Sequence, residues 1–352
     1  MPCPADLSIV GPVCRRVAGV LLALLILIAG CKQREEQASP GHQATPLAVT
    51  ICHGSVADIL PHIALERGYF SEEGLTVTLK DLSNGKLAFD GLLQGECNFA
   101  VSGAPPIVLA DPQSPPFAIL ATVLADDDST RIIGRRDRGI AKPRDIKGKR
   151  IGVKKEVTSH FFLDLFMMKH GLGQNEVIRV FMEPDAFQAA LSNGEIDGFS
   201  MTNRMVNDAA ETLGDQGVVF AEPGLILLHG ILTTRPDIPF NLQVAPKVLK
   251  ALVRAEQYAK SEPAAAKDLL GRTSKLPLRE IEEIWGWATI EVALANTLFV
   301  HLEDQYRWQV ERGGTPGPAV MPNYLNLVLP GYLQAIKPGA VSIIKPTAGG
   351  PR

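Results

Sequence analysis

Small polar residues stand at four places where a predicted strand gives way to a predicted helix. In an open parallel sheet, ligands bind beyond the carboxyl ends of the strands. A helix that starts there presents unpaired N–H groups and a partial positive charge, which favour oxyanions. The pattern therefore predicts a small-ligand site built largely from neutral dipoles. Its residues are Gly54 and Ser55, Ser102, Gly103 and Ala104, Thr158, Ser159 and His160, and Thr202 and Asn203.

Each junction by itself has a plainer interpretation. Ser55, Ser102 and Thr158 would each serve as a helix cap, worth about 1 kcal/mol. His160 either donates to an anion or caps its own helix, and both interpretations stay open. Four equivalent positions favour a site over four unrelated caps, and the neighbouring Lys154 and Lys155 could supply one countercharge.

The elements that position these junctions occur twice. The segment 92–102 (LLQGECNFAVS) reappears in altered form at 190–200 (ALSNGEIDGFS), and in both copies a glycine ends a helical pattern before a short apolar strand. Two similar β-α-β-α-β blocks result, at 48–103 and 150–201, which predict an α/β fold of two facing lobes. The predicted strands of the first block are Ala48–Cys52, Leu75–Leu79 and Cys97–Val101.

Two further apolar strands connect the lobes. Arg131–Arg135 is predicted to cross to the second lobe and Leu225–Thr234 to return. Helical patterns from 246 to 287 are expected to cover the first lobe, and the Pro- and Gly-rich Pro338–Arg352 to form a loose tail. We therefore expect lobe I at 47–133 plus 232–352 and lobe II at 134–231, with Asp126, Asp127 and Asp128 in a solvated loop.

The front of the chain has the features of an export signal. Arg15 and Arg16 precede an apolar run, Val17–Gly30, that is short for a membrane span and typical of a signal-peptide core. The run ends in LIAGC, which resembles the bacterial lipobox. We expect residues 1–30 to be a lipoprotein signal peptide, Cys31 to carry the lipid anchor, and the polar residues 31–46 to act as a flexible tether.

Charge and cysteine content restrict the function further. Loss of residues 1–30 removes two Arg and one Asp from the 35 basic and 38 acidic residues, leaving a net charge near −4 without a basic cluster. This argues against nucleic-acid partners. Cys52 and Cys97 remain in the body. They lie several residues out of register if their strands are parallel neighbours, so two free, buried thiols are expected.

The usual catalytic and cofactor motifs are absent from the sequence. It contains no phosphate-binding loop, dinucleotide glycine fingerprint, His-Glu-x-x-His, Cys-x-x-Cys or Gly-x-Ser-x-Gly, and no two of its seven His have helical i, i+4 spacing. We therefore predict no catalytic residue, no metal site and no cofactor.

Three segments resemble a known family. The segment 64–75 (ALERGYFSEEGL), the segment 95–100 (GECNFA) and the segment 140–153 (IAKPRDIKGKRIGV) are similar to motifs of the substrate-binding proteins of nitrate, sulfonate, taurine and thiamine-precursor ABC importers. The resemblance implies a type II periplasmic-binding-protein fold, with two α/β lobes, a ligand cleft and two crossover strands. The junctions at Ser55, Ser102 and Thr158–His160 fall where the family holds its ligands. Met201-Thr202-Asn203 departs from the family pattern.

The resemblance and the lipobox together imply a monomeric extracytoplasmic lipoprotein. It would capture a small organic or inorganic anion, sulfonate- or nitrate-like, and deliver it to the permease and ATPase subunits of an ABC importer. Three alternatives stay open: binding of a thiamine-precursor pyrimidine for import, an enzyme of pyrimidine or menaquinone biosynthesis on the same fold, and a sensor that reports to a membrane receptor.

Overall fold

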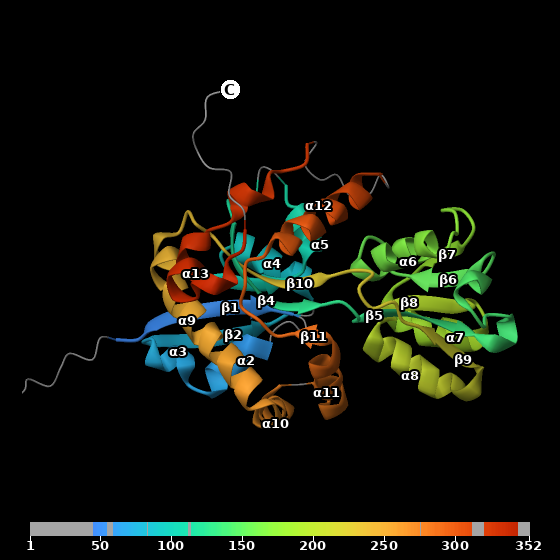
Figure 1. The fold of residues 1–352 in the computed structure, drawn as a ribbon, viewed down its shortest axis with the longest axis horizontal. Helices are drawn as coiled ribbons and strands as arrows, with labels where there is room; N and C mark the ends of the chain where they lie inside the picture. The colour runs from blue at the N-terminus through green and yellow to red at the C-terminus, as the bar shows by residue number, and fades with distance from the viewer. Residues whose placement is uncertain are drawn as a thin grey trace, which may run out of the picture. The chain divides into compact units, whose positions relative to one another are not determined.

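Strands from the whole length of the chain assemble into two mixed sheets (Figure 1). The computed structural model describes residues 45–54, 59–82, 84–111, 114–274, 276–311 and 320–343. The first sheet has the order β2-β1-β3-β10-β4-β11 and the second the order β7-β6-β8-β5-β9. The first comprises β1 (Leu47–His53), β2 (Leu75–Asp81), β3 (Phe99–Ser102), β4 (Ala118–Asp126), β10 (Leu228–Thr234) and β11 (Ala288–Thr289). The second comprises β5 (Thr130–Arg135), β6 (Arg150–Val153), β7 (Ile178–Phe181), β8 (Gly198–Thr202) and β9 (Gly217–Phe220).

Helices cover both faces of each sheet. In the second sheet, Ile132 of β5 packs in the core beneath α6, and Ile133 packs on the other face with residues of α7 and α8. This alternation is the period-2 pattern of a strand buried on both sides. The helices of the second sheet are α6 (Thr158–Lys169), α7 (Phe187–Asn193) and α8 (Asn203–Leu213). Those of the first are α2 (Ile59–Glu66), α3 (Tyr69–Glu72), α4 (Gly85–Leu93), α5 (Ala104–Val108), α9 (Pro239–Ser261), α10 (Pro263–Thr273), α11 (Leu278–Trp287), α12 (Asn296–Glu311) and α13 (Pro330–Ile336).

Two short segments, 127–129 and 221–227, connect the sheets. The strand β5 pairs with β8 and β9 along its whole length, so it lies entirely in the second sheet, and the expected boundary at 133/134 falls inside it. Asp126 belongs to β4 and not to a solvated loop. It is 7% exposed, burial raises the pKa of its carboxyl group, and its Oδ1 accepts the Ser129 N–H at 3.1 Å.

The repeated segment makes equivalent hydrogen bonds in both lobes. In the first, Asn98 exchanges two hydrogen bonds with the strand beside it: its N–H donates to the Thr50 carbonyl at 2.9 Å, and its Oδ1 accepts the Thr50 N–H at 2.8 Å. Arg235, which follows β10, then donates to the Leu93 carbonyl at the end of α4, at 3.0 Å, and pairs with Asp237. The Gly-Glu turn is thereby fastened to β1 and β10.

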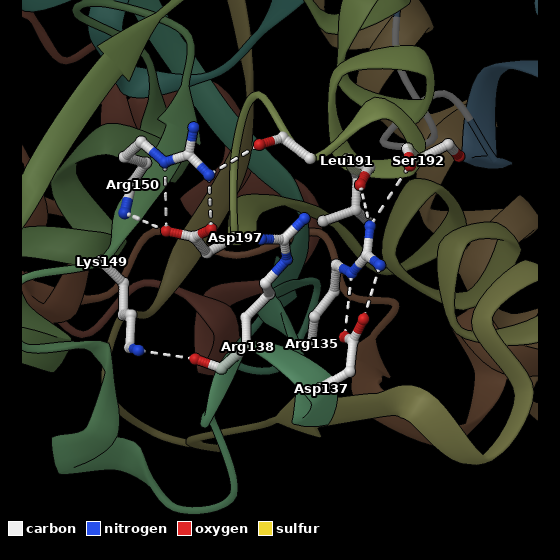
Figure 2. A network of polar contacts seen from close by, with 9 residues as sticks. Arg135, Asp137, Arg138, Lys149, Arg150, Leu191, Ser192 and Asp197 are labelled. Carbon is white, nitrogen blue, oxygen red and sulfur yellow. Dashed lines mark hydrogen bonds and ion pairs between the residues drawn. The ribbon is translucent and has the colours of Figure 1, made fainter.

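In the second lobe, Asp197 takes the position that Asn98 has in the first. Figure 2 shows the contacts of Asp197. Its N–H donates to the Arg150 carbonyl at 2.7 Å, and its Oδ2 accepts the Arg150 N–H at 2.9 Å. The Arg150 side chain adds an ion pair at 2.7 Å. Arg135, the last residue of β5, donates to the carbonyl groups of Leu191 and Ser192 and pairs with Asp137. The two lobes are therefore repeats in their hydrogen bonding as well as in sequence.

Cys52 and Cys97 form a disulfide bond, so the expectation of two free thiols is wrong. Ala100 is the residue that pairs with Cys52 across the parallel strands, and an extended chain would carry Cys97 about 10 Å away from it. However, β3 begins only at Phe99, and the chain before it curls through Gly95, whose φ is +78°. The two Cα atoms consequently lie 5.9 Å apart in a buried cluster with Ala88, Leu92 and Ala100.

Loss of this disulfide should destabilise the protein substantially. It closes a loop of sequence separation 45, and cross-links of that span lower the entropy of the unfolded chain. We expect the double variant Cys52→Ala/Cys97→Ala to lose about 2–4 kcal/mol of unfolding free energy in urea titrations. Thiol titration of the unfolded, unreduced wild-type protein should find neither thiol free, and two reactive thiols at these positions would contradict the assignment.

The C-terminal region differs from expectation in two ways. The helix α12 was not predicted, and its Trp308 packs into the core of the second lobe, so the C-terminal helices do not cover the first lobe alone. The start of the expected tail is held against the rest of the protein, because Val341 pairs with Leu294.

The remainder of that tail, the predicted signal peptide, Cys31 and the tether as far as residue 44 lie outside the described residues. Among the helices that are described, none combines the length and the apolarity required to cross a membrane.

Candidate functional site

The structure brings the two first-lobe junctions together around Gly85. A Cβ atom on Gly54 would lie 2.6 Å from the Asn84 backbone, and one on Gly85 would lie 3.3 Å from the Ser102 Cα atom. The ends of β1 and β3 therefore meet at one place that requires small residues. Ser102 is fully buried, and its hydroxyl donates to the Gly103 carbonyl at 3.4 Å. Ser55 lies outside the described residues.

The helix that starts at Ala104 offers fewer donors than expected. Gly103 is its N-cap, and Pro105 and Pro106 follow within the first turn. Proline has no N–H group, so two of the donors that a helix start normally presents are missing. The backbone N–H groups of Gly103 and Ala104 remain at this junction.

In the second lobe, the start of α6 is fastened to the end of β8. Val157 occupies the N-cap, so Thr158 lies one residue inside the helix and is not the cap. Thr158 is half-buried and Ser159 is buried. The Ser200 hydroxyl donates to the Ser159 carbonyl at 2.9 Å. Two residues before Thr158, Glu156 adopts φ = 62°, a strained conformation that non-glycine residues rarely take and that clusters at ligand sites.

His160 is held by protein groups on all sides. Its Nδ1 accepts the Glu156 N–H at 3.3 Å, and its Nε2 lies 3.8 Å from Asp164 Oδ2. The ring makes edge contacts with Phe181 and Trp308, at centroid distances of 5.4 and 5.0 Å. These contacts fit the capping interpretation of His160 better than direct donation to a ligand.

Asp164 links three elements beneath His160. Arg179 Nη2 donates to its Oδ1 at 2.6 Å, and the indole Nε1 of Trp308 donates to its Oδ2 at 2.7 Å. A buried carboxylate is expensive unless it is paired and hydrogen-bonded, and both partners are supplied here. The charge of Asp164 is therefore satisfied within the protein.

The last junction lies beside a connecting segment. Thr202 is exposed at the N-cap of α8. Asn203 is buried and holds the segment 127–129, because its backbone N–H donates to the Ser129 carbonyl at 3.0 Å and its side-chain amide donates to the Asp128 carbonyl at 2.5 Å. Asn203 thus holds the connection between the sheets, whereas Thr202 is exposed to solvent.

Sequence reasoning missed the polar face of α12. His301 contacts His229 of β10, with 3.2 Å between their Nδ1 atoms. Burial lowers the pKa of His229 to about 4 and that of His301 to about 3, so both rings are neutral near pH 7. Gln305 and Gln309 follow at i+4 and i+8 and are also buried. The available signal was the helical spacing of three polar residues beside the apolar Leu298 and Leu302.

The cations near the junctions already have partners. Lys154 pairs with Glu183 at 2.7 Å and Lys155 with Glu156 at 3.2 Å, so neither supplies the free countercharge considered above. The site is therefore dominated by hydroxyl, amide and backbone dipoles. Within the part of the chain that the structure describes, no three His, Cys, Asp or Glu residues are placed to hold a metal ion.

A cavity of about 400 Å³ lies elsewhere in the first lobe, between the end of α5 and Tyr324. Phe117 in its wall precedes Ala118, which pairs with Thr234 at the end of β10 farthest from His229. The wall is mainly apolar, and the four junctions contribute nothing to it. This cavity is therefore separate from the candidate site.

Comparison with known sequences identifies the family of the chain. The sequence model of the family described as "NMT1/THI5 like" matches residues 60–266, more than half of the chain. The chain belongs to the NMT1/THI5-like family. The predicted relationship is thereby confirmed.

Relatives of this NMT1/THI5-like chain include solute-binding proteins. The taurine-binding periplasmic protein of Escherichia coli K12 is 28% identical over 157 residues, covering 44% of this chain and about half (48%) of the relative. The putative aliphatic sulfonates-binding protein of Bacillus subtilis 168 is 24% identical over 276 residues, covering 75% of this chain and 80% of the relative.

Comparison with a solved structure identifies the fold. The periplasmic aliphatic sulphonate binding protein SsuA from Escherichia coli superposes with a TM-score of 0.66 at 16% identity, covering 80% of this chain and 97% of that one. The NMT1/THI5-like chain therefore has the type II periplasmic-binding-protein fold that the motifs implied.

The buried imidazoles make the stability of the protein depend on pH. The pKa values of His229, His301 and His62 (about 4) all lie below the usual 6.5, so the unfolded chain binds protons first as the pH falls. The free energy of unfolding should have its full value above pH 6.5. It should fall progressively towards pH 4, by up to about 1.4 kcal/mol per pH unit for each ring. Urea titrations between pH 6.5 and 5 should show that the free energy of unfolding changes less steeply with pH in His301→Gln than in the wild type, by at least one ring's contribution. An unchanged pH dependence would contradict this account.

Proposed function

We propose that this protein is the solute-binding component of an ABC importer, anchored by lipid at Cys31 outside the cytoplasm. It would bind a small organic anion of the sulfonate class between its two lobes, at 47–126 with 228–343 and at 130–220, as a monomer. It would deliver that ligand to permease and ATPase subunits and would catalyse no reaction. The names of the taurine- and sulfonate-binding relatives support the ligand class.

The observation that carries this proposal is the convergence of junctions from both lobes on α12. The β3–α5 junction lies at the start of α5, on which α12 packs, and Trp308 of α12 contacts His160 and Phe161 just inside α6. A ligand held there touches both lobes. Binding would consequently favour a closed arrangement, with the movement taken up by the segments 127–129 and 221–227.

The disulfide supports the proposed compartment. Such bonds persist in oxidising surroundings and are rare in the cytosol. The Cys52–Cys97 bond is buried, with the two side chains 0% and 4% exposed, as expected of a structural link. Export through the predicted signal peptide would provide those surroundings.

Thermal-shift measurements test the ligand class. A ligand that binds the folded state alone raises its stability, by about 2.7 kcal/mol at a hundredfold excess over Kd. We expect short alkanesulfonates to give such a shift, and nitrate, carboxylates and pyrimidines to give less. Thr158→Val should weaken sulfonate binding about tenfold, because it removes one hydroxyl from the junction.

Thr78→Val, at an exposed position on β2, is the matched control and should leave binding unchanged. A shift given by none of the sulfonates, or by pyrimidines alone, would refute the proposed ligand class.

Metabolic labelling tests the anchor. Bacteria that express the full-length protein with radiolabelled palmitate should incorporate the label into it, because the lipobox cysteine is the lipidation site. Cys31→Ala should abolish incorporation. Label retained in that variant would disprove the proposed anchor.

A further inference from the structure

A strip of buried polar side chains runs along α12. His301, Gln305 and Gln309 are 6%, 0% and 3% exposed and recur every four residues, so they share one face of the helix. Trp308 lies on the same face. We refer to His301, Gln305 and Gln309 as the α12 strip.

The ends of the α12 strip lie at the two lobes. His301 contacts His229, the second residue of β10, directly after the connecting segment 221–227. Seven residues along the helix, Trp308 contacts His160 and Phe161 of α6. Gln305 lies between these contacts in the helix, so its side chain is placed where the two lobes adjoin. Gln309 lies one turn further on.

The amides of the strip have no hydrogen-bond partner among the residues that the structure describes. Among the described residues, neither Oε1 nor Nε2 of Gln305 and of Gln309 has a hydrogen-bond partner, and the same holds for His301 Nε2. Buried polar side chains almost always have a partner, either in the protein or in a bound molecule. An amide carries a donor and an acceptor side by side, so a molecule that satisfies it must offer both.

The strip carries no formal charge. Its imidazole is neutral near pH 7. Among the buried carboxylates described above, Asp164 is held by Arg179 and Trp308, and Asp126 accepts the Ser129 N–H while burial raises the pKa of its carboxyl group. The three side chains of the strip themselves offer no counterion to a cationic group on a ligand, whereas a hydroxyl or carboxamide group would satisfy both halves of the amides.

We propose that Gln305 and Gln309 bind the ligand directly, and that the ligand carries a neutral hydroxyl or carboxamide group in addition to its anionic group. This inference rests on the proposed function for the anionic group, and on the strip for the neutral one. The helix α12 would then form a third wall of the site, beside the junctions of the two lobes.

Three small sulfonates of matched length test this inference in calorimetric titrations of the full-length chain. They differ only in the terminal group: isethionate has a hydroxyl, propane-1-sulfonate a methyl and taurine an ammonium. We expect isethionate to bind at least about tenfold more tightly than the other two. Gln305→Met and Gln309→Met should each abolish this preference, and Gln94→Met, an exposed control at the end of α4, should retain it.

The ligand-free melting temperatures separate binding from a structural role. Replacing an unpaired buried amide by an apolar group of similar shape should keep or raise the melting temperature. If the preference for isethionate survives in both variants, or if both variants melt lower and bind as the wild type does, the inference is overturned. Tighter binding of taurine than of isethionate would overturn the assignment of a neutral group.

Failure of the proposed function can be distinguished from failure of the inference about the α12 strip. If the wild-type protein binds none of the three sulfonates, the proposed ligand class is refuted, and the melting temperatures alone decide about the strip. A higher melting temperature in Gln305→Met and Gln309→Met then supports the inference that the amides lack a partner within the protein. A lower melting temperature shows that the amides stabilise the fold.

Discussion

The architecture of each lobe depends on one side chain that bonds to the backbone of its first strand. Asn98 does so at Thr50 and Asp197 at Arg150, in both cases two residues after the Glu of a Gly-Glu turn. The exchange fixes the register between the turn and the strand. It thereby places the carboxyl ends of β1 and β3, and of β6 and β8, at one edge of each sheet, which is where the candidate ligand junctions lie.

The two lobes differ in how they are completed. The first contains a disulfide at the position where the second has Ile196, a buried apolar residue. The second is completed by Trp308 of α12, and the indole of Trp308 donates to the buried Asp164. Because removing one partner from a buried carboxylate is costly, this single contact ties a C-terminal helix of the first lobe to the second lobe. The same helix carries the polar strip, so this structural role and the proposed binding role share α12.

Local patterns were sufficient for much of the fold and for locating the candidate junctions. The repeat, the strand-helix junctions and most elements followed from periodicity, glycine positions and the family motifs. The structure places the predicted site residues differently. Gly54 packs against Asn84, and Ser102 and Gly103 lie beside Gly85, whereas the Asn203 side chain donates to the segment 127–129 and His160 lies beside Asp164. A residue's type indicates that it needs a partner, but local sequence does not say which partner will be nearest.

The sequence by itself determined the two-lobe α/β fold, the duplicated turn and the positions of the junctions, because these depend on interactions between residues close along the chain. Tertiary structure alone decided the Cys52–Cys97 bond, since the curl before β3 replaces the extended chain that strand pairing implied. It also decided that the polar residues of α12 face the region where the lobes adjoin. Contacts between residues more than seventy positions apart, such as His229 with His301, form only when the sheets are assembled, and no local pattern encodes them.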